Sequence, residues 1–572
     1  MRGARLGAHP EGDATTFRVF TTTASQVGVR LFDASGAKSL RTELLDAKGD
    51  GIFEKTLAGV RAGDHYKLVL DDDELPDPYA RFLPFGVHGP ARIVESEREP
   101  ALATPPPLHR WVIYELHVGT FTEEGTYRAA IERLDHLALL GVTAIELMPL
   151  AAFDGRRGWG YDGVAFYAPH APYGEPEDLR AFVRAAHERD LAVILDVVYN
   201  HFGPSGNYLA RYAPSYFTSA ETLWGQGPAF ADPHLRSLVV ENARYWLDEY
   251  GFDGLRLDAT HAIHDSSPKH VLREIVEVAH ALTPARRVFF EDERNEPAVI
   301  REDGADGVWA DDLHHQIHVL LTGERDGYYA KYEPTVAALA KTIVQGWGDR
   351  GKPAGDLPYE HFVTCIQNHD QVGNRAFGTR LSAHVDAEAF CAAVALLLFL
   401  PATPLLFMGQ EWLATTPFLF FSDHEGELGE AIRRGRREEF KTFAAFADPE
   451  VRSRIPDPQS ESTFTASKLR WSELASEPHA RVLELHRAML HLRKHDAVLS
   501  RPCSRGELEV QTRNALLDIT RVKDGESRRL LVNFGAAPIT VPTPDPASPL
   551  VTTGTWSSNV LGPKSAVVLT RT

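Results

Sequence analysis

Between residues 111 and 409, short apolar runs alternate with stretches of helical spacing, and this alternation limits the possible folds more than any other feature. It is typical of βα units arranged around a parallel sheet. Eight strands are predicted, at residues 112–117, 144–148, 192–197, 254–258, 288–291, 307–310, 362–366 and 404–408. Eight strands can close a (β/α)8 barrel, the TIM barrel. Because the sixth run is short, an open doubly wound sheet is the alternative at this point.

The flanking segments have a β-type pattern instead. Residues 1–95 alternate polar and apolar side chains between Gly and Asp turns, which predicts an N-terminal β-sandwich, and the proline-rich stretch 96–110 predicts a linker. The barrel with helical insertions is expected over 111–495, and a C-terminal β-sandwich over 496–572. Within the barrel region, the basic run 433–437 is expected to be a solvated helix face, since such runs usually are.

Charge and cysteine content limit the partners and the compartment. The formal net charge is -19, from 60 basic and 79 acidic side chains, so neither nucleic acid nor a membrane surface is an expected partner, and a neutral ligand fits better. Only three cysteines occur, and the N-terminus lacks the apolar core of a signal peptide, so a cytoplasmic location is expected. The longest apolar run, 389–400, is too short to span a bilayer and predicts a buried helix.

Polar side chains interrupt the apolar pattern where four of the predicted strands end. They are Asp196, Asn200 and His201 after the third strand, Arg256 and Asp258 in the fourth, Glu291 in the fifth, and Asn368, His369 and Asp370 after the seventh. One such group alone would indicate no more than a helix cap or a turn. Barrel enzymes, however, assemble their sites from the carboxyl ends of several strands, so four groups together indicate an active site.

The fourth strand contains the segment Gly251-Phe-Asp-Gly-Leu-Arg-Leu-Asp258. In an extended chain, Arg256 and Asp258 point to one side and the neighbouring leucines to the other. A nearby guanidinium favours the ionised carboxylate, which would leave Asp258 available as a nucleophile at neutral pH. A structural ion pair at a strand end is the alternative interpretation.

The fifth strand offers two candidates for a general acid, Glu291 and Glu293, because alternation places both on one side and Asp292 on the other. Glu291 is preferred because it follows an apolar run, where burial and neighbouring carboxylates would both raise its pKa. For Glu293, a solvated loop with Arg294 as its partner is the simpler interpretation.

Three carboxylates with two histidines and an arginine match what glycoside hydrolysis requires, namely a nucleophile, a proton donor and polar groups that bind sugar hydroxyls. A metal site is the main rival. The histidines lack the i, i+4 spacing of common zinc sites and no cysteine pair is available, so no metal is expected. No organic cofactor is expected either, because the glycine-rich stretches lack phosphate-binding spacing.

Together the segments resemble the α-amylase family of glycoside hydrolases. The resemblance rests on Asp196-Val-Val-Tyr-Asn-His201, Gly251-Phe-Asp-Gly-Leu-Arg-Leu-Asp258, Glu291 after its strand, and Asn368-His-Asp370. It favours the barrel over the open sheet and implies a carbohydrate-binding-like N-terminal domain. It also implies that Asp258 is the nucleophile, Glu291 the general acid/base, and Asp370 the acid that stabilises the transition state.

The resemblance implies further site residues. Arg256, His201 and His369 would line the same sugar subsite, and Tyr161 would stack on the sugar. Trp224, in a glycine-rich loop, is a further aromatic that could contact substrate or fill the core. The chain departs from the family pattern directly after Glu291, where a small residue, Asp and Leu are usual and residues 292–294 are Asp, Glu and Arg.

Five further segments resemble the family members that act on trehalose-terminated chains. They are Tyr114-Glu-Leu-His-Val-Gly-Thr-Phe121, Trp159-Gly-Tyr-Asp-Gly163, Asn200-His-Phe-Gly-Pro-Ser-Gly-Asn-Tyr208, Ile366-Gln-Asn-His-Asp-Gln-Val-Gly-Asn-Arg375 and Pro417-Phe-Leu-Phe-Phe-Ser-Asp-His424. The implied reaction is retaining hydrolysis of the α-1,4 bond between a maltooligosaccharide and its terminal trehalose unit, with trehalose as product. Gln371 and Asn374 are hypothesised to reach the trehalose because they adjoin Asp370.

Two rival functions are weighed against this reaction. Glycogen branching enzyme, an α-1,4 to α-1,6 glucan transferase, uses the same carboxylates, and the segment 367–375 argues against it. A non-catalytic carbohydrate-binding barrel belongs to a different class, and the presence of both Asp258 and Glu291 argues against that reading.

Overall fold

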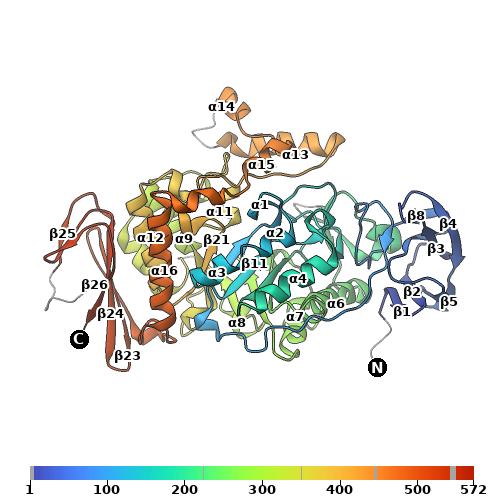
Figure 1. Cartoon of the computed structure of the whole chain (residues 1–572), viewed down its shortest axis with the longest axis horizontal. Helices are drawn as coiled ribbons and strands as arrows, with labels where there is room; N and C mark the ends of the chain where they lie inside the picture. The colour runs from blue at the N-terminus through green and yellow to red at the C-terminus, as the bar shows by residue number, and fades with distance from the viewer. Residues whose placement is uncertain (1–4, 223–224, 349–350, 443–447, 542–548, 572) are drawn as a thin grey trace.

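The structure is a computed structural model that describes residues 5–222, 225–348, 351–442, 448–541 and 549–571. It has three parts in a row, an N-terminal β-domain, a central barrel surrounded by helices, and a C-terminal β-domain (Figure 1). A small helical unit stands above the barrel. Within the described ranges, the search for a helix long and apolar enough to cross a membrane finds none.

The central sheet closes into a parallel eight-stranded barrel, so the TIM barrel prediction is confirmed and the open-sheet alternative is wrong. Its strands, in barrel order, are β10 Ile113–Leu116, β11 Ala144–Leu147, β14 Ala192–Val197, β17 Gly254–Leu257, β18 Arg287–Glu291, β19 Gly307–Trp309, β20 Phe362–Cys365 and β21 Thr403–Phe407. Each lies within a residue or two of a predicted strand. The short sixth strand pairs on both sides, to β18 and to β20.

Helices pack around the barrel through apolar faces. The longer ones are α4 Pro176–His187, α6 Pro233–Glu249, α7 Val271–His280, α9 Asp312–Thr322, α10 Val336–Gln345 and α12 Ala387–Phe399. In α7, Val271, Ile275 and Ala279 are buried at i, i+4 spacing, which is the apolar stripe that a surface helix presents to a core. From Ala389 onward α12 is buried on every side, so the prediction of a buried helix is confirmed.

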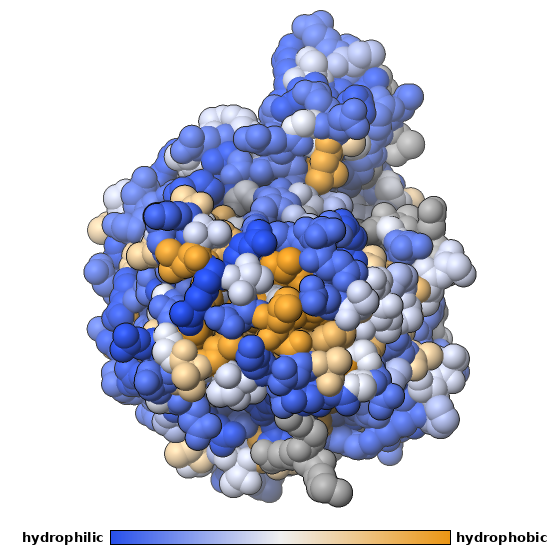
Figure 2. Space-filling view, turned by 90° about the vertical axis from the view of Figure 1, so that its right-hand side faces the viewer, coloured by the Kyte–Doolittle hydropathy of each residue, from blue (hydrophilic) through white to orange (hydrophobic). Residues whose placement is uncertain are grey.

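The N-terminal domain is built from two antiparallel sheets. One contains β1 Gly7–Glu11, β2 Ala14–Phe20, β6 Ile52–Ala58 and β5 Asp46–Gly49, and the other β4 Ser39–Leu44, β3 Val27–Phe32, β7 His65–Leu70, β8 Asp73–Leu75 and β9 Ala91–Arg92. Phe17 and Val19 alternate with outward polar residues along β2 and enter a shared core. The outer end of this domain shows hydrophobic residues within a largely hydrophilic surface (Figure 2).

The C-terminal domain packs against the back of the barrel region. Its main sheet has the order β22 Leu508–Arg513, β23 Leu516–Lys523, β24 Glu526–Asn533, β29 Ser565–Arg571 and β26 Pro549–Thr553. A three-stranded sheet accompanies it, made of β25 Ile539–Thr540, β28 Val560–Leu561 and β27 Trp556–Ser557. α12 and α16 His479–His495 lie between the barrel and the main sheet (Figure 1). Arg521 of β23 donates to the Phe399 carbonyl at the end of α12, at 3.1 Å.

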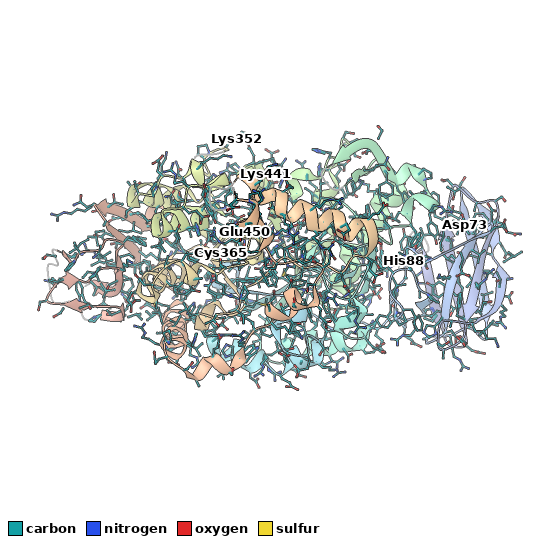
Figure 3. All side chains as sticks on the ribbon, turned by 90° about the horizontal axis from the view of Figure 1, so that it is seen from above. Asp73, His88, Lys352, Cys365, Lys441 and Glu450 are labelled. Atoms are coloured by element: carbon teal, nitrogen blue, oxygen red, sulfur yellow. The ribbon has the colours of Figure 1, made fainter. Side chains whose placement is uncertain are left out.

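The helical unit above the barrel contains α13 Gly426–Glu439, α14 Pro449–Ser453 and α15 Glu461–Ala466. Figure 3 looks down on this unit, with Lys441 and Glu450 over the central part of the molecule. The expectation of a fully solvated basic face on α13 is wrong at one position, because Arg436 is buried. Its guanidinium donates to the carbonyls of Gly373 and Arg375, at 2.7 and 2.9 Å.

Candidate active site

The fourth barrel strand places the two residues that the sequence singled out on the same side. Arg256 of β17 is fully buried inside the barrel, and Leu255 and Leu257 pack in the surrounding core. Asp258 follows the strand, and its backbone N–H donates to the Val197 carbonyl at 3.1 Å. The predicted alternation is therefore confirmed, and it brings the Arg256 guanidinium and the Asp258 carboxylate together.

Arg256 joins three carboxylates from three strands. Its Nη1 donates to Asp196 Oδ2 and to Asp258 Oδ1, each at 2.8 Å, and its Nη2 lies 2.8 Å from Glu291 Oε2. The guanidinium also lies over the Trp309 ring, 4.3 Å from the centroid. Because one planar group binds both Asp258 and Glu291, the two carboxylates face a common space.

The direction of the pKa shift at Asp258 differs from the simple expectation. Burial raises its pKa, Arg256 opposes that effect, and the carboxylates of Asp196 and Asp370 add to it, so the net shift is upward. Arg256 therefore limits the rise in pKa without reversing it. Asn200 Nδ2 also approaches Asp258 Oδ2, at 3.3 Å.

Glu291 ends β18 and points into the site. Its Oε2 accepts a hydrogen bond from the Ala259 backbone N–H at 2.9 Å, and Ala259 has a left-handed φ of 39°. Burial raises the pKa of Glu291, Arg256 opposes the rise, and Asp258 supports it, which gives the upward direction expected from the sequence. The Glu293 side chain is 77% exposed, with His261 Nε2 3.7 Å away, so it lies in solvent as the simpler interpretation predicted. The expected partner is wrong, because Arg294 binds Asp292 instead, with its Nε 2.8 Å from Asp292 Oδ1.

The seventh strand supplies a short helix, α11 His369–Gly373. Asn368 caps it, its side chain accepting from the Gln371 N–H at 2.8 Å. The Asp370 carboxylate is 34% exposed, lies 3.4 Å from His369 Nε2, and accepts from Asn374 Nδ2 at 3.0 Å. The cap therefore orients this end of the helix with Asp370 toward the site.

Tyr161 and His201 lie beside this helix. The Tyr161 hydroxyl donates to Asp196 Oδ2 at 2.6 Å, and its ring stacks on His369 with the centroids 5.2 Å apart. Gly160 precedes it with φ of +100°, and a Cβ there would lie 2.3 Å from the Pro149 carbonyl oxygen, so the turn requires glycine. His201 is buried, and its Nε2 lies 2.9 Å from the Tyr161 carbonyl oxygen.

A cavity of about 290 Å³ opens beside these groups. It is lined by His261, Glu291, Asp292, Glu293, Asn295, Trp309, Asp311, Asp312, His315, Tyr328, Tyr332, Asp370, Gln371 and Asn374. Gln371, which was hypothesised to reach the substrate, lies in the lining of this cavity. Its Oε1 accepts a hydrogen bond from the Tyr328 hydroxyl at 3.3 Å. Among the residues that the structure describes, no group of three or more His, Cys, Asp or Glu could hold a metal ion.

Two acidic residues of the site were not predicted, although each is a polar residue in or directly after an apolar strand, which is the pattern that marked the others. Asp311 follows the sixth strand, and burial together with Glu291 and Asp370 raises its pKa to about 8. Glu115 interrupts the apolar strand β10 and contacts His369 from below. Trp224 lies outside the described residues.

A closed barrel with a carboxylate cluster at the carboxyl ends of its strands is the architecture of an α-amylase-type glycoside hydrolase. The protein-family model of the alpha amylase catalytic domain matches residues 90–222. The family model of carbohydrate-binding module 48, the isoamylase N-terminal domain, matches residues 5–80. A domain of unknown function, DUF3459, matches residues 503–568.

Whole-chain comparisons give the family. Malto-oligosyltrehalose trehalohydrolase of Deinococcus radiodurans is 50% identical over 93% of this chain and 90% of its own length. The chain belongs to the malto-oligosyltrehalose trehalohydrolase family, a group of α-amylase-type glycoside hydrolases. A crystal structure from Salmonella typhimurium, of a protein described as a candidate alpha amylase, superposes with a TM-score of 0.90 at 38% identity, covering 99% of both chains.

The rival transferase is more distant. The 1,4-alpha-glucan branching enzyme of Corynebacterium jeikeium is 27% identical over 75% of this chain and 66% of its own length. The hydrolase is therefore better supported than the branching enzyme.

Proposed function

We propose that this enzyme hydrolyses the α-1,4 glucosidic bond next to the terminal trehalose of maltooligosyltrehalose and releases trehalose, within trehalose biosynthesis. Related α-glucans are the wider substrate class. The observation that carries the chemistry is the contact of one buried guanidinium, that of Arg256, with both Asp258 and Glu291. The trehalose specificity rests on the 50% identical relative of that name.

In the proposed mechanism, Asp258 attacks the anomeric carbon while Glu291 protonates the oxygen of the leaving trehalose. The raised pKa of Glu291 supports this role, since it favours the protonated form. In the second step Glu291 accepts a proton from water, which attacks the glycosyl ester at Asp258 and frees the maltooligosaccharide.

The remaining predicted site residues are proposed to bind substrate. Asp370 would accept hydrogen bonds from the hydroxyls of the reacting sugar, and His369 would contact the same ring. Tyr161 would offer a stacking face. Gln371 would meet the leaving trehalose from the cavity wall. His201 would act indirectly, by holding Tyr161 in place, because its Nε2 lies against the Tyr161 carbonyl oxygen.

Substrate preference tests the proposal. Maltotriosyltrehalose and maltopentaose are incubated separately with the enzyme, and free trehalose and maltooligosaccharides are quantified. Release of trehalose from the first substrate at a much higher rate than any cleavage of the second supports the proposal. Preference for maltopentaose would reduce the function to that of a general amylase, and new α-1,6 branches in treated amylose would favour the transferase.

We also propose the division into a carbohydrate-binding-like domain at 1–95, a linker at 96–110, a catalytic barrel with helical insertions at 111–495 and a C-terminal β-domain at 496–572. A cytoplasmic location is proposed as well, supported by cysteines that are free and buried at all three positions. Cell fractionation with an antibody against the chain tests the location.

A further inference from the structure

Beneath the candidate active site, a buried carboxylate contacts a site histidine on two atoms. Glu115 Oε2 accepts from the His369 backbone N–H at 2.9 Å, and its Oε1 lies 2.5 Å from His369 Nδ1. Both side chains are about 1% exposed. No sequence motif assigns a role to Glu115, and the proposed chemistry does not use it directly.

The hydrogen bonds around His369 indicate that both ring nitrogens carry protons. Nδ1 faces the Glu115 carboxylate, which accepts when ionised. Nε2 lies 2.8 Å from the Tyr161 hydroxyl, which donates its only proton to Asp196 and therefore accepts from His369. Arg256 donates to both Asp196 oxygens, which keeps Asp196 an acceptor.

We propose that Glu115 is a positioning residue that holds His369 as an imidazolium, and that this cation keeps Tyr161 and Asp370 in place for the reaction. The inference rests on the proposed function for its kinetic readout. A fixed cation beside Asp370 also balances part of the negative charge of the surrounding carboxylates.

The charges around His369 agree with this assignment. The charged groups facing it are Glu115 from β10, Glu146 from β11, Asp196 from β14, Arg256 from β17, Glu291 from β18 and Asp370 from its own helix. Two further titratable groups face it, His117 after β10, whose pKa is lowered by burial to about 4, and the Tyr161 hydroxyl. Burial alone would lower the pKa of His369, but Asp370 and Glu115 raise it to about 10, with Arg256 opposing.

Glu146 provides a matched control on the neighbouring strand. It is in register with Glu115, equally buried, and neither of its carboxylate oxygens has a hydrogen-bond partner among the described residues. Burial, with Glu115 and Asp196 adding to it, raises its pKa well above the ordinary value, which favours the protonated form. A Glu146→Gln substitution therefore breaks no hydrogen bond of the described residues, whereas Glu115→Gln removes the carboxylate that contacts His369.

The first experiment compares kcat/KM against pH for wild type, Glu115→Gln and Glu146→Gln, with maltotriosyltrehalose as substrate. Without the Glu115 anion the pKa of His369 falls, so the variant loses the imidazolium at a lower pH than the wild type does. Glu115→Gln is expected to lower kcat/KM about tenfold or more at pH 8 and less than about threefold at pH 5.5. Glu146→Gln is expected to keep the wild-type profile.

The second experiment reads the protonation of the wild-type protein directly and needs a folded variant only to assign the signal. Histidine-selective 15N NMR of the wild-type protein at pH 8.5 reports the two ring nitrogens of His369, whose signal is assigned by its loss in His369→Asn. Two protonated nitrogens support the proposal. A neutral ring, an equal loss of kcat/KM at every pH in Glu115→Gln, or the same shift in Glu146→Gln would overturn it. Failure of the wild type to release trehalose would refute the proposed function. The NMR result would still test whether His369 is an imidazolium next to Glu115.

Discussion

At the residue scale, Asp258 and Glu291 carry the proposed chemistry, and isosteric amides remove it. Asp258→Asn or Glu291→Gln is expected to lower kcat by about 10³-fold or more, because each keeps the shape and loses either the nucleophile or the proton donor. Turnover of maltotriosyltrehalose gives the rate, and thermal melting shows whether the fold is retained.

Glu293→Gln is the matched control for this prediction, since Glu293 is two residues away and its side chain is 77% exposed. Its kcat is expected to stay within about twofold of wild type, as for most exposed substitutions. A large loss in Glu293→Gln with little loss in Glu291→Gln would exchange the two assignments.

Asp311 gives a pH-dependent prediction about stability. Its pKa is about 8 in the folded protein and 3.8 in the reference state, so between these values the folded state holds a proton that the unfolded chain has lost. Wild-type stability therefore falls as pH rises through this window. Asp311→Asn does not titrate, and we expect it to be more stable than wild type by about 1 kcal/mol or more at pH 8, with the gain vanishing near pH 4.

Chemical denaturation at both pH values measures this effect, and Asp312→Asn is the neighbouring contrast. Asp312 accepts hydrogen bonds from the Tyr332 hydroxyl and from Asn295 Nδ2. Losing one acceptor there is expected to destabilise the fold by about 1 kcal/mol at either pH. A gain for Asp311→Asn that is equal at pH 4 and pH 8 would contradict the ionisation argument.

Local alternation was enough to predict how Arg256 and Asp258 face the site, because that geometry depends only on the extended backbone. The net pKa direction at Asp258 was not predictable, because it depends on burial and on carboxylates from two other strands. Glu115 was missed for a related reason, since its partner, His369, is 254 residues away along the chain.

At the element scale, the helical unit above the barrel supports the helix that carries Asp370. Arg436 of α13 donates from one guanidinium nitrogen to the carbonyls of Gly373 and Arg375 at the end of α11. The other terminal nitrogen of Arg436 donates to Glu439 at 3.0 Å. Arg436→Lys keeps the charge, but a single ammonium cannot hold both sets of acceptors, so we expect kcat to fall about threefold to tenfold. Arg434→Lys, at an exposed position of the same helix, is expected to have no effect. Equal activity of both variants and wild type would show that the support is dispensable.

The eight barrel strands were predictable because each is an apolar run whose length and spacing are set locally. The packing of α13 was not predictable, because nothing in the five-residue basic run indicates which of its arginines will donate to backbone carbonyls. Only the return of the chain over α11 selects Arg436 from that run.

At the scale of the whole molecule, Glu249 ties the N-terminal domain to the barrel. It ends α6, is 1% exposed, and binds Arg5 at 2.8 Å and Arg81 at 3.1 Å. Glu249→Gln leaves these cations without a buried counter-charge, so we expect a loss of about 2 kcal/mol or more in unfolding free energy. Glu241→Gln, whose carboxylate is 42% exposed and 3.6 Å from Arg5, is the control and should change little. Equal denaturation midpoints for both variants would argue against an interdomain tie.

The acidic lining of the cavity has a consequence for which carbohydrates are admitted. Six acidic side chains, those of Glu291, Asp292, Glu293, Asp311, Asp312 and Asp370, border the opening. The raised pKa values of Glu291 and Asp311 favour their neutral forms, so the negative charge comes mainly from the other four. A phosphorylated sugar approaching it meets charge of its own sign, whereas an uncharged glucan does not. We therefore expect the entrance to disfavour sugar phosphates relative to uncharged glucans of the same size, before any hydroxyl group is recognised.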